Sequence, residues 1–152
     1  MKKQMTCTLA TGESLYSRFE FLRLLQVGGA DIIQPDICVV GGLLEMRKIA
    51  AIAEAHYVTV APHNPMGPVA GAVALNFDVA TTNFVIQAEA VGIVPWFEEI
   101  CSVHPLQLRD RSWMVPDAPG LGIEVAEIAD ARHPSAPERP PAMATLVGVA
   151  AV

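Results

Sequence analysis

Short apolar runs alternate with longer segments of helical periodicity along the first 90 residues of the chain. The apolar runs lie near residues 6–10, 30–34, 58–61 and 84–87, about 25 residues apart. Strands joined through helices are parallel, and strands covered on both faces read as continuous apolar runs. The alternation therefore predicts an α/β fold with four parallel strands.

Three helices are predicted between these strands. The first begins at Ser17-Arg18-Phe19-Glu20, a capping box in which the serine and glutamate side chains bond free backbone N–H groups, and it ends at Gly28-Gly29. The second is predicted from apolar residues that recur at helical spacing between Leu43 and Ala53, and the third covers about 68–80. Each of the first three strands is thus followed by a helix.

The same pattern fits a doubly wound sheet or part of a (β/α)8 TIM barrel. A complete barrel needs about 250 residues, so a barrel interpretation makes this chain about half of one. The periodicity ends near Val91, residues 115–122 resemble a loop, and Ile123-Glu124-Val125 forms a candidate short strand. The Pro-rich segment 131–152 is expected to be a disordered tail.

Composition excludes several classes of protein. The chain is 52% hydrophobic and 17% charged, which is typical of a globular protein, and its net charge of −6 provides no basic surface for nucleic acid. No apolar run reaches the roughly 18 residues of a membrane-spanning helix, and no secretory signal is recognisable. Three cysteines without CxxC spacing indicate free thiols and a cytoplasmic protein.

Ionisable residues follow successive predicted strands. Glu13, Asp36 and His63 come directly after the first three strands, and Glu89 lies near the fourth. The carboxyl ends of parallel strands meet at one edge, where α/β proteins build their sites. Each residue also has a simpler interpretation: Glu13 as a solvated turn residue, Asp36 as the cap of a turn, and His63 as a structural histidine.

If these residues form a site, their types indicate metal-assisted removal of a proton next to a carboxylate. A glutamate is a suitable oxygen ligand for Mg²⁺, although one carboxylate does not make a tight site. An aspartate beside a histidine fixes the imidazole tautomer and raises its basicity, which gives a general base near neutral pH. A metal would stabilise the enediolate that remains when the proton leaves.

Four motifs occur together in order: Ala10-Thr11-Gly12-Glu13, Gln34-Pro35-Asp36, Gly41-Gly42 and the run from Ala61 to Pro68. With Pro119-Gly120-Leu121-Gly122-Ile123-Glu124, they resemble the mandelate racemase group of the enolase superfamily, in its galactonate dehydratase branch. The resemblance covers about residues 6–127. It implies that residues 1–100 are the C-terminal half of an enolase-type barrel, with strands 5–8, and that 101–130 form the return segment.

The resemblance also implies roles. Glu13 would be one of three carboxylate ligands of Mg²⁺, and Asp36 and His63 would form the dyad that removes the proton α to the carboxylate of a sugar acid. Loss of the neighbouring hydroxyl would give a 2-keto-3-deoxy acid. A racemase or epimerase on the same scaffold, and an inactive self-associating chain, remain alternative functions.

Two departures from the family pattern stand out. Strands 1–4, the other metal carboxylates and the acid that assists the leaving hydroxyl have no counterpart in these residues, so a homo-oligomer or a complementing half-barrel chain is the expected partner. The family glutamate of strand 8 aligns with Ala88. Glu89 is the candidate replacement, although adjacent strand residues point to opposite faces.

Overall fold

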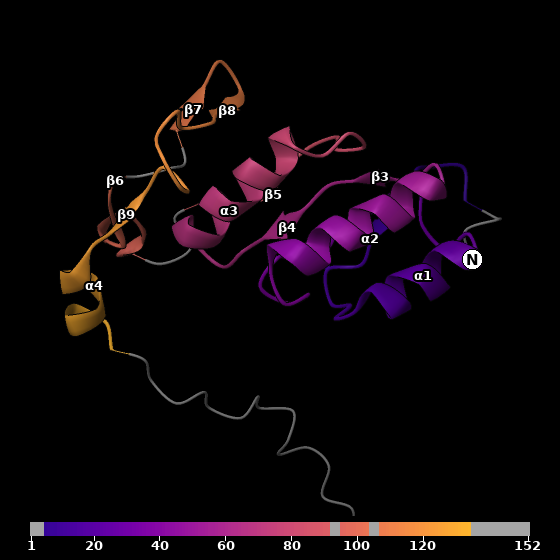
Figure 1. Ribbon diagram of the computed structural model, residues 1–152, viewed down its shortest axis with the longest axis horizontal. Coiled ribbons are helices and arrows are strands. Elements are labelled where there is room, and N and C mark those ends of the chain that lie inside the picture. The colour runs from indigo at the N-terminus through magenta and orange to yellow at the C-terminus, as the bar shows by residue number, and fades with distance from the viewer. Residues whose placement is uncertain (1–4, 92–94, 104–106, 135–152) are drawn as a thin grey trace, which may run out of the picture.

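The computed structural model describes residues 5–91, 95–103 and 107–134. Its first part consists of parallel strand–helix units, and its second part consists of short antiparallel strands (Figure 1). The α/β prediction is confirmed. Residues 135–152, most of the expected tail, lie outside the described residues, and residues 131 and 132 belong to a helix.

The first three strands overlap their predicted apolar runs and occur in the predicted order. The fourth was predicted at 84–87 but forms just after that run, at Ala88–Glu89, and Phe84 makes only an isolated bridge to Val60. β1 (Ala10–Thr11), β2 (Ile32–Ile33) and β3 (Thr59–Val60) form one parallel sheet in the order β1-β2-β3. β4 (His63–Asn64) and β5 (Ala88–Glu89) form a second parallel pair. Because β3 and β4 belong to one stretch of chain, these segments form four neighbouring parallel strand positions.

Three helices follow the strands, as predicted. They are α1 (Arg18–Gln26), α2 (Leu43–Ala55) and α3 (Pro68–Val79). The predicted capping box is present at the start of α1, where the Glu20 carboxylate accepts hydrogen bonds from the backbone N–H of Ser17 at 2.8 Å and from its hydroxyl at 3.0 Å. Figure 1 shows α1 and α2 side by side along the strands.

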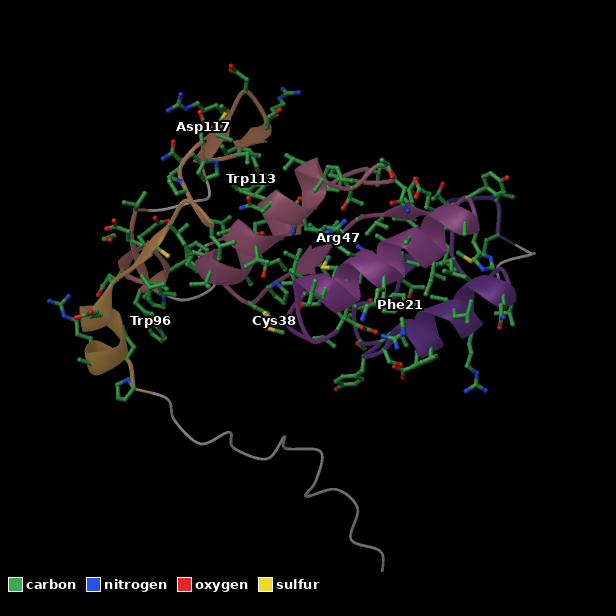
Figure 2. The ribbon with its side chains drawn as sticks, viewed as in Figure 1. Phe21, Cys38, Arg47, Trp96, Trp113 and Asp117 are labelled. Carbon is green, nitrogen blue, oxygen red and sulfur yellow. The ribbon has the colours of Figure 1, made fainter. Side chains whose placement is uncertain are left out.

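The main hydrophobic core lies between these helices and the strands. Phe21 of α1 is fully buried in it (Figure 2), together with Ile33 of β2 and Val60 of β3. Gly12, at the end of β1, approaches the Phe21 ring so closely that a Cβ there would stand 2.8 Å from Cε1. Its φ of +122° is also one that L side chains rarely adopt, so this position requires glycine.

The second part of the structure lies beyond α3, away from α1 and α2 (Figure 1). Its strands are β6 (Cys101–Val103), β7 (Gln107–Arg109), β8 (Ser112–Met114) and β9 (Glu124–Val125). A 3₁₀ turn, Phe97–Glu99, precedes them and α4 (Glu127–Arg132) follows. β6 pairs with β9 and β7 with β8, both antiparallel.

The expected strand at 123–125 is confirmed by β9, whereas the β7–β8 hairpin was not predicted. The hairpin turns at Asp110 and Arg111, both with positive φ, which is the geometry of a type I′ turn. Its sequence lacks the glycine that usually marks such a turn. Trp113 of β8 packs against Leu75 of α3 and Phe97, which joins the two parts of the structure.

Within the described ranges, the helices are all too short or too polar to cross a lipid bilayer.

We expect Phe21→Ala to lower the free energy of unfolding by about 3–5 kcal/mol, because it removes a buried ring and leaves a cavity. The matched control is Phe19→Ala in the same helix, because the Phe19 side chain is 60% exposed. Urea unfolding followed by circular dichroism measures both. Equal destabilisation by the two substitutions would contradict the assigned core.

Candidate active site at the carboxyl ends of the strands

Asp36 is a buried carboxylate with several hydrogen-bond partners. It follows β2 and Pro35, and its side chain is only 1% exposed. Its Oδ1 accepts hydrogen bonds from the backbone N–H groups of Cys38 at 2.8 Å and Val39 at 3.2 Å. The turn-cap interpretation of Asp36 is therefore correct, but it uses only one of the two carboxylate oxygens.

The second oxygen of Asp36 faces His63. Oδ2 lies 3.1 Å from Nδ1 of the imidazole, and a parallel bridge joins the two residues, with the backbone N–H of His63 donating to the carbonyl of Pro35. The His63 side chain is 34% exposed. The carboxylate therefore fixes the ring from its buried side, and the other side of the imidazole can meet a substrate.

Glu13 stands apart from this pair as an exposed residue in the turn after β1. Leu15 donates its backbone N–H to the carbonyl of Gly12 across this turn. Among the described residues, no three His, Cys, Asp or Glu side chains are grouped so that they could hold a metal ion. Because Mg²⁺ needs a nearly octahedral set of oxygens, these residues do not by themselves form a magnesium site.

Glu89 pairs with Asn64 across the strands, although Glu89 and His63 both line one small pocket. In the parallel pairing of β4 with β5, His63 is opposite Ala88 and Asn64 is opposite Glu89. The Asn64 amide donates to both carboxylate oxygens of Glu89, each at 2.8 Å. Since neighbouring residues of a strand point to opposite faces, Ala88 occupies the position on the His63 face. Burial raises the pKa of Glu89 to about 6, although the hydrogen bonds from Asn64 and Gln87 lower it.

A further carboxyl group, Asp78 of α3, was not identified from the sequence. It is 7% exposed, and no donor among the described residues bonds either of its oxygens. Burial raises its pKa to about 7, and the negative charge of Glu89 contributes. One feature of the sequence could have identified Asp78: an aspartate within the apolar run Ala74-Leu75-Asn76-Phe77-Asp78-Val79.

The chain's likeness to known proteins agrees with this arrangement. Residues 1–129 match the protein family described as "Enolase C-terminal domain-like". The chain belongs to this enolase family. Its parallel strand–helix units are therefore part of the enolase C-terminal barrel domain, as the resemblance implied. Membership of this superfamily implies a divalent metal in general.

Individual relatives agree with this assignment. The chain is 44% identical over 124 residues to a D-galactonate dehydratase of Verminephrobacter eiseniae, covering 78% of this chain and 32% of that protein. It is also similar to the crystal structure of an enolase from Agrobacterium radiobacter with bound Na and L-malate. That match has a TM-score of 0.77 and 46% identity, and it covers 86% of this chain and 36% of the other.

A mandelate racemase/muconate lactonizing enzyme from Jannaschia sp. CCS1 matches with a TM-score of 0.79 and 32% identity, over 89% of this chain and 34% of that one. The chain thus spans about a third of the length of the proteins that it matches, and is close to D-galactonate dehydratases over their C-terminal third. Homology to acid-sugar dehydratases is established by these matches.

The raised pKa values predict how Asp78 affects stability. A carboxyl whose pKa is higher in the folded state than in the unfolded state favours folding when protonated, and this stabilisation is lost as pH rises through the folded-state value. For Asp78 this pH range runs from the ordinary pKa of 3.8 to the raised pKa of about 7, and for Glu89 from 4.5 to about 6. We expect Asp78→Asn to raise the melting temperature relative to the unsubstituted chain progressively more from pH 4 to pH 8.

Thermal unfolding followed by circular dichroism at a series of pH values measures this difference. Asp117→Asn, at an exposed loop aspartate, is the matched control and should leave the pH profile unchanged. A difference between Asp78→Asn and the unsubstituted chain that does not vary with pH would contradict the buried, unpartnered state of Asp78.

Proposed function

We propose that this chain supplies the proton-abstracting half of a Mg²⁺-dependent acid-sugar dehydratase of the galactonate type. The observation that supports this proposal most strongly is the 3.1 Å contact between Asp36 Oδ2 and His63 Nδ1 at the carboxyl ends of two neighbouring parallel strands. The sequence similarity to D-galactonate dehydratases supports the substrate class.

His63 is the proposed base. Nδ1 faces the carboxylate of Asp36, which holds the proton on that nitrogen and leaves Nε2 as the site that accepts a proton from the substrate. The Asp36 carboxylate also stabilises the imidazolium that forms. Its own position is fixed because two backbone N–H groups, from Cys38 and Val39, hold Oδ1. Asp36 is thus a positioning residue, and His63 is the group that touches the substrate.

The reaction has two bond-breaking steps. His63 removes the proton from the carbon α to the substrate carboxylate, and the electron pair of the C–H bond moves into the carboxylate to give an enediolate. The electrons then return, the neighbouring C–O bond breaks, and the hydroxyl leaves as water after it takes up a proton from an acid that lies outside the described residues. The resulting enol becomes a 2-keto-3-deoxy acid, so the net change is the loss of one water molecule.

Glu13 is proposed as one carboxylate ligand of Mg²⁺. Its exposed position after β1 leaves it accessible to a metal ion and to further ligands. Because the described residues hold no group of three candidate ligands, water and carboxylates from outside these residues would supply the other oxygens. Glu89 is the weaker catalytic candidate, because its carboxylate accepts hydrogen bonds from Asn64, whose strand position faces away from that of His63.

We propose that the partner completes the barrel. The parallel strands leave open edges at β1 and β5, and an open edge presents unpaired backbone groups to another strand. Either a second copy of this chain or a complementing half-barrel chain satisfies those groups.

The three free cysteines and the sugar-acid substrate are consistent with a cytoplasmic enzyme.

Proton NMR in D2O tests the proposed reaction. The purified chain is mixed with Mg²⁺ and galactonate, and the α-proton and any 2-keto-3-deoxy product are followed. We expect exchange or product that His63→Ala abolishes and Asp36→Asn reduces at least about 100-fold, because a wrongly held tautomer cannot accept the proton. His56→Ala, at the exposed end of α2, is the matched control and should retain full activity.

Exchange of the α-proton without elimination would instead support the racemase or epimerase alternative. Exchange that survives His63→Ala, or no exchange in a folded sample that sediments as a dimer or larger assembly, would contradict the proposal. The inactive self-associating chain would then be the better description.

Analytical ultracentrifugation tests the proposed partner. We expect the isolated chain to sediment as a dimer or larger assembly at micromolar concentration, because pairing removes its open strand edges from water. A charged residue on the edge, as in Ala10→Lys, should weaken the assembly, whereas the same change at exposed Ala51 of α2 should not. A monomer at all concentrations would exclude the second copy as partner.

A further inference from the structure

A cavity of about 400 Å³ lies between α3, the segment 84–87 and the β7–β8 hairpin. Its lining is mainly apolar and includes Leu75 of α3, Phe84 and Trp113. Figure 2 shows Trp113 between the hairpin and α3. Neither Asp36 nor His63 contributes to this lining, so the cavity is distinct from the candidate active site.

Two buried residues of this lining carry hydrogen-bond acceptors that lack donors. Both carboxylate oxygens of Asp78 and the side-chain oxygen of Gln87 are unpartnered within the described part of the chain. Asp78 is 7% exposed and Gln87 is 9% exposed. A buried acceptor without a donor costs free energy, and for a carboxylate the cost is larger still. Acceptors from two different elements at one cavity therefore indicate a ligand that donates hydrogen bonds.

The other residues that line the cavity indicate which further chemical groups the ligand carries. Val79, Val85 and Ile86 line the cavity and are 50–66% exposed, so they offer apolar surface to a molecule that enters. The flat ring of Trp113 suits both an apolar group and a cation. Two charged groups lie nearby: Glu89, which adds negative charge, and Arg111, which lines the cavity but bonds neither Asp78 oxygen.

We propose that this cavity binds a cationic hydrogen-bond donor carried on an apolar stem, such as an alkyl- or arylalkylammonium group. The cation pairs with Asp78 and donates to Gln87, while the stem packs against Trp113 and the exposed valines. The same chemistry is offered by a free amine and by a lysine side chain of a partner polypeptide. The inference does not rest on the proposed dehydratase activity.

Titration with benzylammonium tests the proposal, with the indole N–H signal of Trp113 as the readout in proton–nitrogen NMR. Trp96→Phe assigns the two tryptophan signals. We expect benzylammonium to bind at least about tenfold more tightly than neutral benzyl alcohol of the same shape, because only the ammonium forms charge-assisted hydrogen bonds. Asp78→Asn should remove this preference, whereas Asp117→Asn at an exposed loop position should preserve it.

The pH dependence provides an independent signature. Asp78 has a pKa of about 7, so the ammonium should bind more tightly at pH 8 than at pH 6, as the carboxyl loses its proton. Arg111→Ala should leave binding equal or tighter, because it removes a competing cation. Circular dichroism of each variant verifies that it remains folded.

Comparison with N-acetyl-lysine amide distinguishes the two sources. Tighter binding of the lysine derivative than of benzylammonium supports a partner polypeptide, and the reverse order supports a free amine. Equal binding of benzylammonium and benzyl alcohol, or an ammonium preference that survives Asp78→Asn, would overturn the proposal.

Discussion

The register between the parallel strands is the constraint on which the candidate site depends. Ile33 of β2 pairs with Val60 of β3, and both side chains are fully buried in the main core. Three residues further along each strand stand Asp36 and His63, which face each other in the same register. A slip of one residue would expose the core residues and separate the dyad at the same time. The packing of the core therefore also fixes the geometry of the dyad.

The helix layer holds this register through close packing at the first strand. Phe21 fills the space against Gly12, where any larger residue would meet the ring. That contact places the turn that carries Glu13 directly beside the core. Asp36 and His63 thus follow buried residues of β2 and β3, whereas Glu13 follows Gly12 at the end of the exposed to half-buried strand β1.

The carboxyl groups of this structure differ in how their charge is stabilised. Asp36 has two backbone N–H donors and an imidazole partner, so its charge is well accommodated despite complete burial. Asp78 has no such donors among the described residues, and its pKa rises to about 7. Glu89 lies between these extremes, because the Asn64 amide compensates part of its burial. A carboxylate without donors therefore points to a missing partner, whereas a fully bonded one points to a formed site.

Local sequence patterns determined the elements of this protein. Apolar periodicity gave the three helices, the capping box gave the start of α1, and the turn residues after the strands identified Asp36 and His63 as neighbours at one edge. These features depend on residues close together in the chain, so the sequence alone specifies them.

Only the tertiary structure decided which residues meet across elements. It paired Ala88 with His63 and Glu89 with Asn64, it buried Asp78 of α3 without a donor from the described residues, and it formed a hairpin whose sequence lacks the usual turn glycine. Strand register and burial arise from packing between segments distant in sequence, and a one-residue shift inverts the face of every side chain. Local patterns carry no information about such a shift. They placed Asp36 and His63 at one edge of the sheet, and the family resemblance, not the patterns, implied the dyad. The alternation of strand faces anticipated that Glu89 points away from His63, but its bonds to Asn64 and the burial of Asp78 depend on packing that the sequence does not show.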